Sequence, residues 1–129
     1  MAGAHIAIHP TGRWVYCSNR GHDSIAVYAV NEADGTLSRS VRSLPPSALP
    51  SGRIVSGLKC VGVSVAQEIT LTGGETPRNF QINAAGTLLL AGNQDSDTIH
   101  AFSIDQATGT LTPTGAVGAA PSPVSLCIV

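Results

Sequence analysis

The sequence predicts an all-β protein made of repeated four-stranded antiparallel units, and three observations support this. A long segment of the chain is duplicated, and each copy contains short alternating β-type runs separated by Gly, Asn and Asp turns. No stretch shows the 3.6-residue period of an amphipathic helix. The 129 residues are 43% hydrophobic and only 12% charged, with 14 Gly and 8 Pro, and this length suits one domain.

The duplication relates residues 5–38 to residues 79–112, without a gap, at an offset of 74 positions. Nine positions are identical, namely Ile8/Ile82, Gly12/Gly86, Asn19/Asn93, Asp23/Asp97, Ile25/Ile99, Ala33/Ala107, Gly35/Gly109, Thr36/Thr110 and Leu37/Leu111. Apolar positions, turn glycines and the shared aspartate all stay in register, so the two segments are copies of one unit.

Each copy reads as four strands. In the first copy we expect strands over residues 5–9, 14–18 and 24–30, with a fourth beginning at Thr36. The second copy repeats them over residues 80–83, 87–92, 98–104 and 110–115. Four short antiparallel strands per repeat are typical of a β-propeller blade.

The offset of 74 exceeds the roughly 40 to 50 residues of such a blade. Residues 41–67 have no counterpart in the other copy and begin with a Pro/Ser-rich stretch; without these 27 residues the offset becomes 47. We therefore predict a first blade from residues 1–40 and 68–78, and an insert over 41–67 that splits its outer strand and is disordered. Residues 79–120 form a second blade and 121–129 the closing strand of a further blade, so the ring is incomplete.

The edges of the insert suggest an origin. Every valine codon begins with GT and one of the two glutamine codons ends in AG, the sequences at the two ends of an intron. A segment of whole codons that begins at Val41 and ends at Gln67 is therefore what translation through a retained in-frame intron would give. The alternative is an ordinary surface loop between two strands. Sequencing the transcript distinguishes them, because a retained intron requires a shorter message.

Charge and hydropathy exclude several partners. A formal net charge of -1 provides no field to hold a polyanion, which argues against nucleic-acid binding and polybasic membrane attachment. No apolar run approaches the roughly 20 residues that span a bilayer. Residues 1–6 lack the basic and apolar regions of a signal peptide, so we expect a soluble, cytoplasmic protein.

The turn over residues 17–24 concentrates the polar chemistry. Arg20 offers a fork of donors for a carboxylate or phosphate, and His22 is a candidate general base. The alternative is a merely solvated turn held by local hydrogen bonds of Asn19 and Asp23. Those two residues recur in the second copy, whereas Arg20 and His22 do not, which favours a structural role for the first pair and a functional one for Arg20.

Arg78 is the second candidate, because it immediately precedes a predicted innermost strand, and such strand entrances face the central channel of a propeller. The alternative is a salt bridge that locks the turn, to Glu75 or Asp95. Residues 93–97 begin like a calcium loop but lack its Gly and terminal Glu, so neither a metal nor a cofactor is expected.

The residues now resemble a known family. Residues 5–16, 18–20 and 23–28 resemble the C-terminal part of the lactonase family, which comprises 6-phosphogluconolactonases and carboxymuconate cycloisomerases built as seven-bladed propellers. Residues 76–80 and 91–96 resemble that family's next blade, and residues 121–127 its closing strand. The resemblance covers nearly everything except residues 41–67.

The resemblance implies a substrate site at the mouth of the channel. There the arginines of the Asn-Arg and Pro-Arg-Asn-Phe motifs, here Arg20 and Arg78, bind anionic groups of the substrate, and a polar residue matching Gln94 sits beside them. The family's proposed His and Glu belong to Gly-Pro-Arg-His and Asn-Glu-Leu motifs of an earlier blade, and neither occurs in this chain. Glu32 follows an Asn but lies in an outer turn.

The expected activity is hydrolysis of a small anionic sugar lactone, as in the pentose phosphate route of carbohydrate metabolism. One alternative is a muconolactone-type cycloisomerase, and another is a non-catalytic propeller module used for interactions. We expect a truncated C-terminal piece with little activity alone, whose open edges pair with missing N-terminal blades or with copies of itself.

Overall fold

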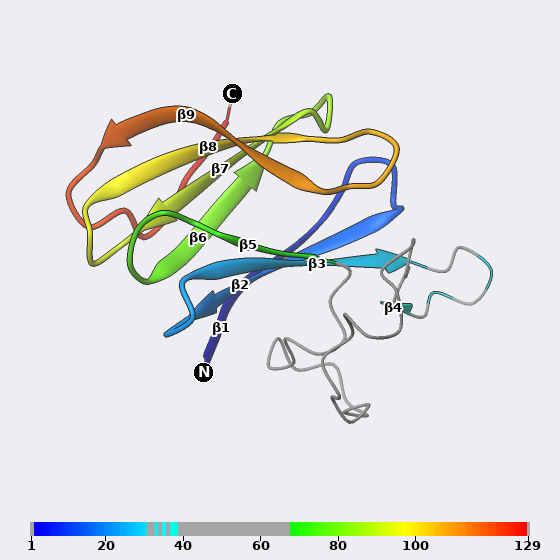
Figure 1. Cartoon of the computed structure of the whole chain (residues 1–129), viewed down its shortest axis with the longest axis horizontal. Coiled ribbons are helices and arrows are strands. Elements are labelled where there is room, and N and C mark those ends of the chain that lie inside the picture. The colour runs from blue at the N-terminus through cyan, green and yellow to red at the C-terminus, as the bar shows by residue number, and fades with distance from the viewer. Residues whose placement is uncertain (1, 31–32, 34, 36, 39–67, 129) are drawn as a thin grey trace, which may run out of the picture.

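The computed structural model describes residues 2–30, 33, 35, 37–38 and 68–128 (Figure 1). Within these residues the chain forms nine strands in two antiparallel sheets, which confirms the predicted all-β class. No helix that could cross a membrane occurs in this part of the chain. Predictions for residues 31–32, 34, 36, 39–67 and 129, and so for the whole insert, lie outside the described residues.

The first sheet comprises β1 (Ala2–Ile8), β2 (Trp14–Arg20), β3 (Ser24–Val30), β4 (Leu37–Ser38) and β5 (Glu68–Leu71). The first three strands are neighbours in sequence order, and both β4 and β5 pair with β3. β4 lies opposite Ala29 and Val30 while β5 lies opposite Ser24–Val27, so together they form one interrupted outer strand, as predicted.

The second sheet comprises β6 (Pro77–Ile82), β7 (Leu88–Asn93), β8 (Thr98–Ile104) and β9 (Leu111–Ala119), in that order. Its registers repeat those of the first sheet: Tyr16 pairs with Val27, and Leu90 pairs with Ala101, 74 positions later. One predicted border is wrong. Pro77 and Arg78, which we assigned to the first unit, begin β6, because the aligned repeat was counted only from residue 79.

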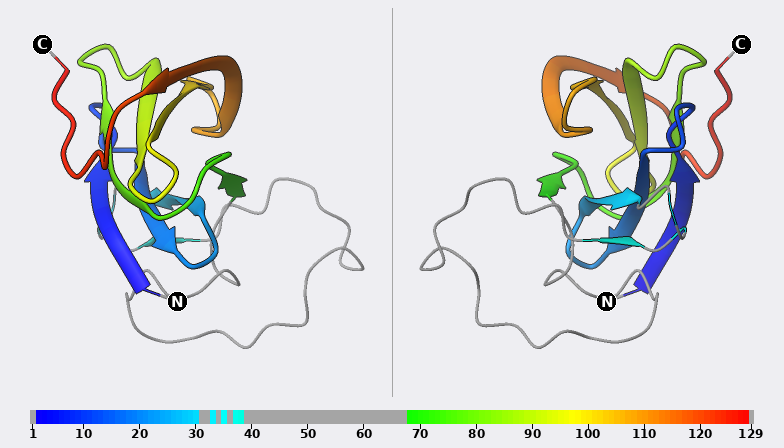
Figure 2. Two further views of the ribbon diagram at one scale, coloured as in Figure 1. Left: turned by 90° about the vertical axis from the view of Figure 1, so that its left-hand side faces the viewer. Right: turned by 90° about the vertical axis from the view of Figure 1, so that its right-hand side faces the viewer.

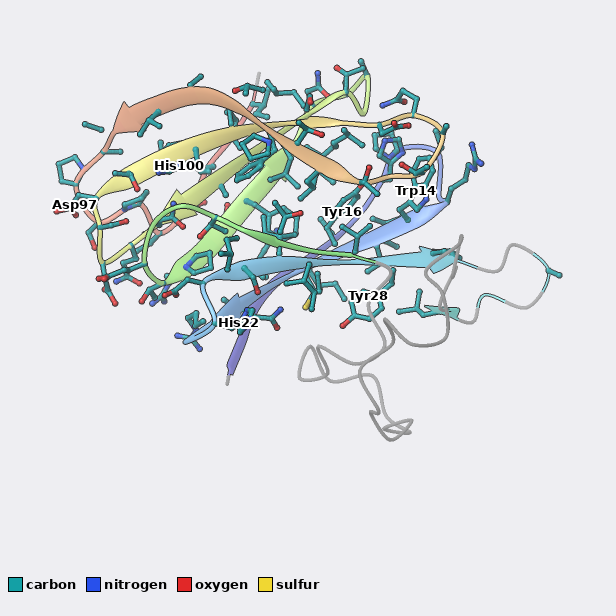
Figure 3. The ribbon with its side chains drawn as sticks, viewed as in Figure 1. Trp14, Tyr16, His22, Tyr28, Asp97 and His100 are labelled. Atoms are coloured by element: carbon teal, nitrogen blue, oxygen red, sulfur yellow. The ribbon has the colours of Figure 1, made fainter. Side chains whose placement is uncertain are left out.

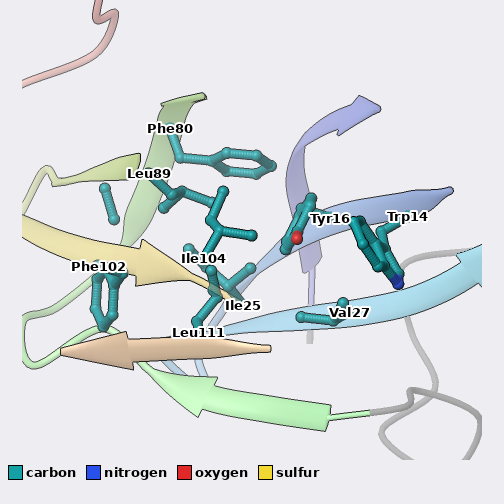
Figure 4. Packing of buried hydrophobic residues seen from close by; sticks show 10 residues of the cluster. Trp14, Tyr16, Ile25, Val27, Phe80, Leu89, Phe102, Ile104 and Leu111 are labelled. Atoms are coloured by element: carbon teal, nitrogen blue, oxygen red, sulfur yellow. The ribbon is translucent and has the colours of Figure 1, made fainter. Parts of the chain in front are cut away.

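The two sheets pack face to face around one apolar core (Figures 2 and 4). Side chains from β2 and β3 meet side chains from all four strands of the second sheet: Trp14, Tyr16, Ile25 and Val27 against Phe80, Leu89, Ala91, Phe102, Ile104 and Leu111. The strands that begin each sheet, β1 and β6, also contact each other. Residues of equivalent strands in the two repeats are therefore neighbours in space.

Residues 120–128 follow β9 without strand pairing. A strand requires a hydrogen-bonded neighbour, and the predicted neighbour of residues 121–129 belongs to a further blade. The segment instead runs along the outer side of the second sheet, where Pro123 and Leu126 lie beside Gly92. Its assignment as a closing strand stays a prediction.

Candidate functional site

The candidate site lies at the end of the two sheets where β2 and β7 finish and where β1 and β6 begin. Antiparallel pairing brings these four strand ends together: Ala2 lies opposite Arg20, and Pro77 lies opposite Asn93. In Figure 3, His22 and Asp97 mark the turns at this end, and Trp14 lies towards the opposite end.

Arg78 and Gln94 are brought together by the second sheet. Arg78 is exposed at the start of β6, where the pairing with β7 is irregular between Pro77 and Asn79. Its Nη1 donates to Oε1 of Gln94 at 3.2 Å. Within the described part of the chain Arg78 makes no ion pair with Glu75 or Asp95, so the alternative of a salt-bridge lock is wrong. A neutral partner leaves the positive charge of the guanidinium uncompensated.

Arg20 ends β2 and is half-buried. Its Nε is buried and has no hydrogen-bond partner among the described residues. The pair of the second sheet is not repeated here: Arg20 occupies the position of Gln94, and the position of Arg78 is taken by Ala4, whose side chain makes no hydrogen bonds. A buried N–H without an acceptor costs about 1 to 3 kcal/mol, and the terminal N–H groups of this half-buried guanidinium can still bind an anionic ligand.

His22 lies in the exposed turn between β2 and β3, where its Nδ1 is 2.8 Å from Oγ of Ser24 (Figure 3). Neither His22 nor Arg20 hydrogen-bonds Arg78 or Gln94. The structure thus places all four candidates at one end and joins only two of them directly. The roles predicted for the four residues stay predictions.

Asp23 and Asp97 have the structural role that the repeat suggests. Asp23 Oδ1 accepts the backbone N–H of Thr76 at 2.9 Å, and Asp97 Oδ1 accepts that of Ser122 at 2.7 Å. Both aspartates have positive φ angles, 53° and 55°, which suit a side chain that bonds nearby backbone. They hold the segment that follows each sheet against the site end.

His5 and Asn79 are neighbours between β1 and β6, a contact that the sequence did not predict. Asn79 Nδ2 lies 3.3 Å from Nδ1 of His5, and the edge-to-face contact of His5 with Phe80 has ring centroids 4.9 Å apart. Partial burial lowers the pKa of His5 below its usual 6.5. The repeat already related these two residues, because positions 5 and 79 are equivalent in the two copies.

The described residues contain no group of three His, Cys, Asp or Glu side chains that could hold a metal ion. The candidate groups at this end are two guanidinium groups, amides and two imidazoles, those of His5 and His22. Such groups can bind anionic oxygens and donate hydrogen bonds to a carbonyl.

Comparison with known proteins supports the same assignment. The model of the seven-bladed β-propeller lactonase family matches residues 1–44 and 62–129. A 6-phosphogluconolactonase from Pectobacterium carotovorum subsp. carotovorum (strain PC1) is 32% identical over 98% of this chain and 47% of its own length. One from Bacillus subtilis (strain 168) is 32% identical over 95% of this chain and 27% of its own.

A crystal structure of a candidate 6-phosphogluconolactonase from Bacteroides fragilis superposes with a TM-score of 0.71 at 30% sequence identity. The match covers 95% of this chain and 27% of the other. The chain thus spans between about a quarter and about half of the length of these relatives. Its two sheets correspond to propeller blades, and the chain belongs to the seven-bladed β-propeller lactonase family.

Proposed function

We propose that this chain carries the anion-binding part of a lactonase site and that its substrate is a phosphorylated sugar lactone, 6-phosphogluconolactone. The relatives named 6-phosphogluconolactonase support this substrate class. The observation that carries the proposal is the pair of arginines at one end of the sheets. Arg78 is exposed beside a neutral amide, and half-buried Arg20 has no acceptor for its Nε among the described residues.

The reaction is the hydrolysis of an ester bond within the lactone ring. Water adds to the carbonyl carbon, the carbonyl oxygen carries negative charge in the tetrahedral intermediate, and the bond to the ring oxygen then breaks. One proton of the water goes to that ring oxygen, which leaves a hydroxy acid. The arginines hold the phosphate and the developing charge, because guanidinium forks match such oxygens.

The described residues include no carboxylate paired with a histidine at this end that could activate the water. This agrees with the absence of the family's Gly-Pro-Arg-His and Asn-Glu-Leu motifs from the sequence. We therefore expect the 129-residue chain to bind the anionic product while hydrolysing the lactone slowly or not at all.

The test is calorimetric titration of the chain with 6-phosphogluconate. Arg20→Gln and Arg78→Gln should each weaken binding about tenfold or more, since hydrogen bonds to charged groups contribute about 1.5 to 3 kcal/mol. Arg13→Gln is the matched control. Arg13 stacks on Trp14 at 4.7 Å, at the other end of β2, about 20 Å away along a seven-residue strand.

Two results would contradict the proposal: no detectable binding of 6-phosphogluconate, or an equal loss in Arg13→Gln. Titration with a muconolactone provides the comparison with the cycloisomerase alternative. Tighter binding of that compound, with the same dependence on Arg20 and Arg78, would move the assignment to cycloisomerase chemistry.

A further inference from the structure

His5 and Asn79 form a contact between the two repeats that the arginine site does not explain. They stand at equivalent positions of β1 and β6, so the same place in two neighbouring blades carries an imidazole in one and an amide in the other. His5 is the fourth residue of β1, which begins at Ala2 opposite Arg20, and Asn79 is the third residue of β6 and directly follows Arg78.

The hydrogen bonds of Asn79 determine which of its amide atoms faces His5. The backbone N–H of Leu126 donates to Oδ1 of Asn79 at 3.1 Å, and this donor requires the oxygen at that position. The Nδ2 group therefore faces His5, 3.3 Å from Nδ1. Because an amide nitrogen only donates, Nδ1 of His5 must accept, and the ring proton resides on Nε2.

Two more contacts hold the imidazole. The backbone N–H of His5 donates to Oγ of Ser18 at 3.0 Å. The ring meets Phe80 edge to face, at an interplanar angle of 84°. The Nε2 atom has no hydrogen-bond partner among the described residues.

The surroundings of His5 favour a neutral ring. No carboxylate contacts the ring within the described part of the chain, and the charged side chains on the neighbouring strand ends are Arg20 and Arg78. Partial burial lowers the pKa of the ring further, so it is neutral near pH 7. With Nδ1 occupied and Nε2 protonated, the neutral ring can donate one hydrogen bond from Nε2 and has no free acceptor atom.

We propose that Asn79 is a positioning residue that holds His5 in the neutral Nε2–H tautomer, and that this N–H donates a hydrogen bond to the carbonyl oxygen of the lactone. The proposal rests on the proposed function. A neutral donor of fixed orientation stabilises the oxygen as its charge develops, and adds no third cation to a site that already has two. The arginines then bind the substrate, while His5 polarises the bond that water attacks.

The tautomer is measured directly by long-range proton–nitrogen correlation spectra of the chain labelled with ¹⁵N-histidine. At pH 7.5 His5 should show a protonated Nε2 and an unprotonated Nδ1. His9 is an internal standard for the same tautomer, because its Nδ1 accepts the N–H of Thr11 at 3.2 Å while its Nε2 meets the carbonyl of Gly86 at 2.8 Å. Asn79→Asp replaces the donor by an acceptor and should move the His5 proton to Nδ1.

The donor role is measured by adding 6-phosphogluconate to the same sample. The Nε2 signal of His5 should shift while that of His9 stays in place. His5→Ala should weaken binding about threefold to tenfold, the range of one neutral hydrogen bond, and His5→Gln, which keeps an N–H donor, should weaken it less.

The outcomes separate the two proposals. A proton on Nδ1 in the wild-type chain, or identical spectra for Asn79→Asp and wild type, overturns the positioning role of Asn79. Binding that depends on Arg20 and Arg78 but leaves the His5 signal unchanged overturns the donor role and keeps the anion site. Absence of any 6-phosphogluconate binding overturns the anion site and, with it, the donor role.

Discussion

Gly109 is one of the residues at which the two sheets approach each other closely, at the end opposite the candidate site. Its φ of +75° is the left-handed region, and a Cβ atom there would come within 2.5 Å of the Trp14 ring. Its carbonyl accepts the hydroxyl of the buried Tyr16 at 2.7 Å. The turn after β8 therefore docks on β2 through backbone, which requires a residue without a side chain.

Gly109→Ala should consequently destabilise the chain more than Gly35→Ala, the equivalent turn position of the first repeat. Both residues have φ above +70°, but a Cβ at Gly35 would meet nothing within 4 Å. We expect Gly35→Ala to lower the unfolding free energy by about 1 to 2 kcal/mol, from backbone strain alone. Gly109→Ala should lower the unfolding free energy by about 1 to 3 kcal/mol more, because the added Cβ overpacks against Trp14. Urea unfolding of the two variants measures the difference, and equal losses would contradict the close approach.

The lowered pKa of His5 predicts a loss of stability in mild acid. The unfolded chain takes up a proton at a pH near 6.5, whereas the folded chain takes it up only at lower pH. The contribution of His5 is therefore complete above pH 6.5 and decreases as the pH falls through that value towards the lower folded pKa. The unfolding free energy, measured in urea between pH 8 and pH 5, should fall less steeply for His5→Gln. An unchanged slope in that variant would refute the assignment.

The sequence was sufficient to choose Arg20, Arg78 and Gln94, because their motifs and their behaviour in the repeat can be read along the chain. It was not sufficient to predict the contact between His5 and Asn79. The contact of His5 with Asn79 depends on how β1 packs beside β6, and that packing is a tertiary property of residues 74 positions apart. Likewise, the sequence did not show that Arg78 bonds the neutral Gln94 rather than its acidic neighbours in sequence, Glu75 or Asp95.

The outer strand is the element that distinguishes the two sheets. In the second sheet β9 is continuous, with an irregular pairing between the partners of His100 and Phe102. By register Leu37 and Ser38 match Leu111 and Thr112, while β5 (Glu68–Leu71) matches residues 116–119. Residues 39–67 thus replace residues 113–115. The extra residues of the first repeat are therefore inserted where β9 of the second repeat already pairs irregularly, as at a β-bulge. At such a position added residues disrupt the fewest hydrogen bonds between the strands.

Alternation and turn residues predicted the strands well, because both repeats obey the same pattern. The residues at which the strands begin and end were less predictable. The start of β6 was placed after Arg78 rather than at Pro77, because a strand begins where its partner allows pairing, and this is not encoded in alternation alone.

Deletion of residues 41–67 should leave the chain folded and raise its unfolding free energy. Closing a loop of 29 residues costs about 2 kcal/mol more than closing one of two residues, from the logarithmic dependence on loop length. A variant in which a Gly/Ser segment of equal length replaces residues 41–67 is the control and should match the wild-type chain. Urea unfolding measures all three. A deletion that destabilises the chain would show that the segment belongs to the folded core.

Across the whole molecule, the repeat continues beyond the second sheet. Thr76-Pro77 and Ser122-Pro123 are equivalent, since both Thr76 and Ser122 have positive φ angles and both are bonded by the aspartate of the preceding sheet. Residues 120–128 therefore start at the point of the repeat where an inner strand starts, and their assignment to a third inner strand stays a prediction. This agrees with a chain that contains parts of three consecutive blades of a larger propeller.

The faces that two blades leave uncovered predict self-association of the isolated chain. Ile6 and Ile8 are 57% and 65% exposed on β1, yet the equivalent Phe80 and Ile82 of β6 belong to or pack against the core. The first sheet thus presents outwards the apolar pattern that the second sheet buries. The outer face of the second sheet repeats the partner surface, with Leu88, Leu90, Ile99 and Ala101 at the positions of Trp14, Tyr16, Ile25 and Val27.

A head-to-tail contact between copies would join these two faces, with β1 of one copy displacing residues 120–128 of the other from the outer side of the second sheet, and it can propagate because each copy keeps one face of each kind. We expect a concentration-dependent mass in sedimentation or light scattering. The double variant Ile6→Lys/Ile8→Lys should shift the association midpoint at least tenfold, because burying either charge against an apolar face is costly. Lys at the exposed positions Ala85 and Thr112 is the control and should leave the midpoint unchanged. A monomeric mass at all concentrations, or equal effects of both lysine pairs, would show that these faces do not mediate association.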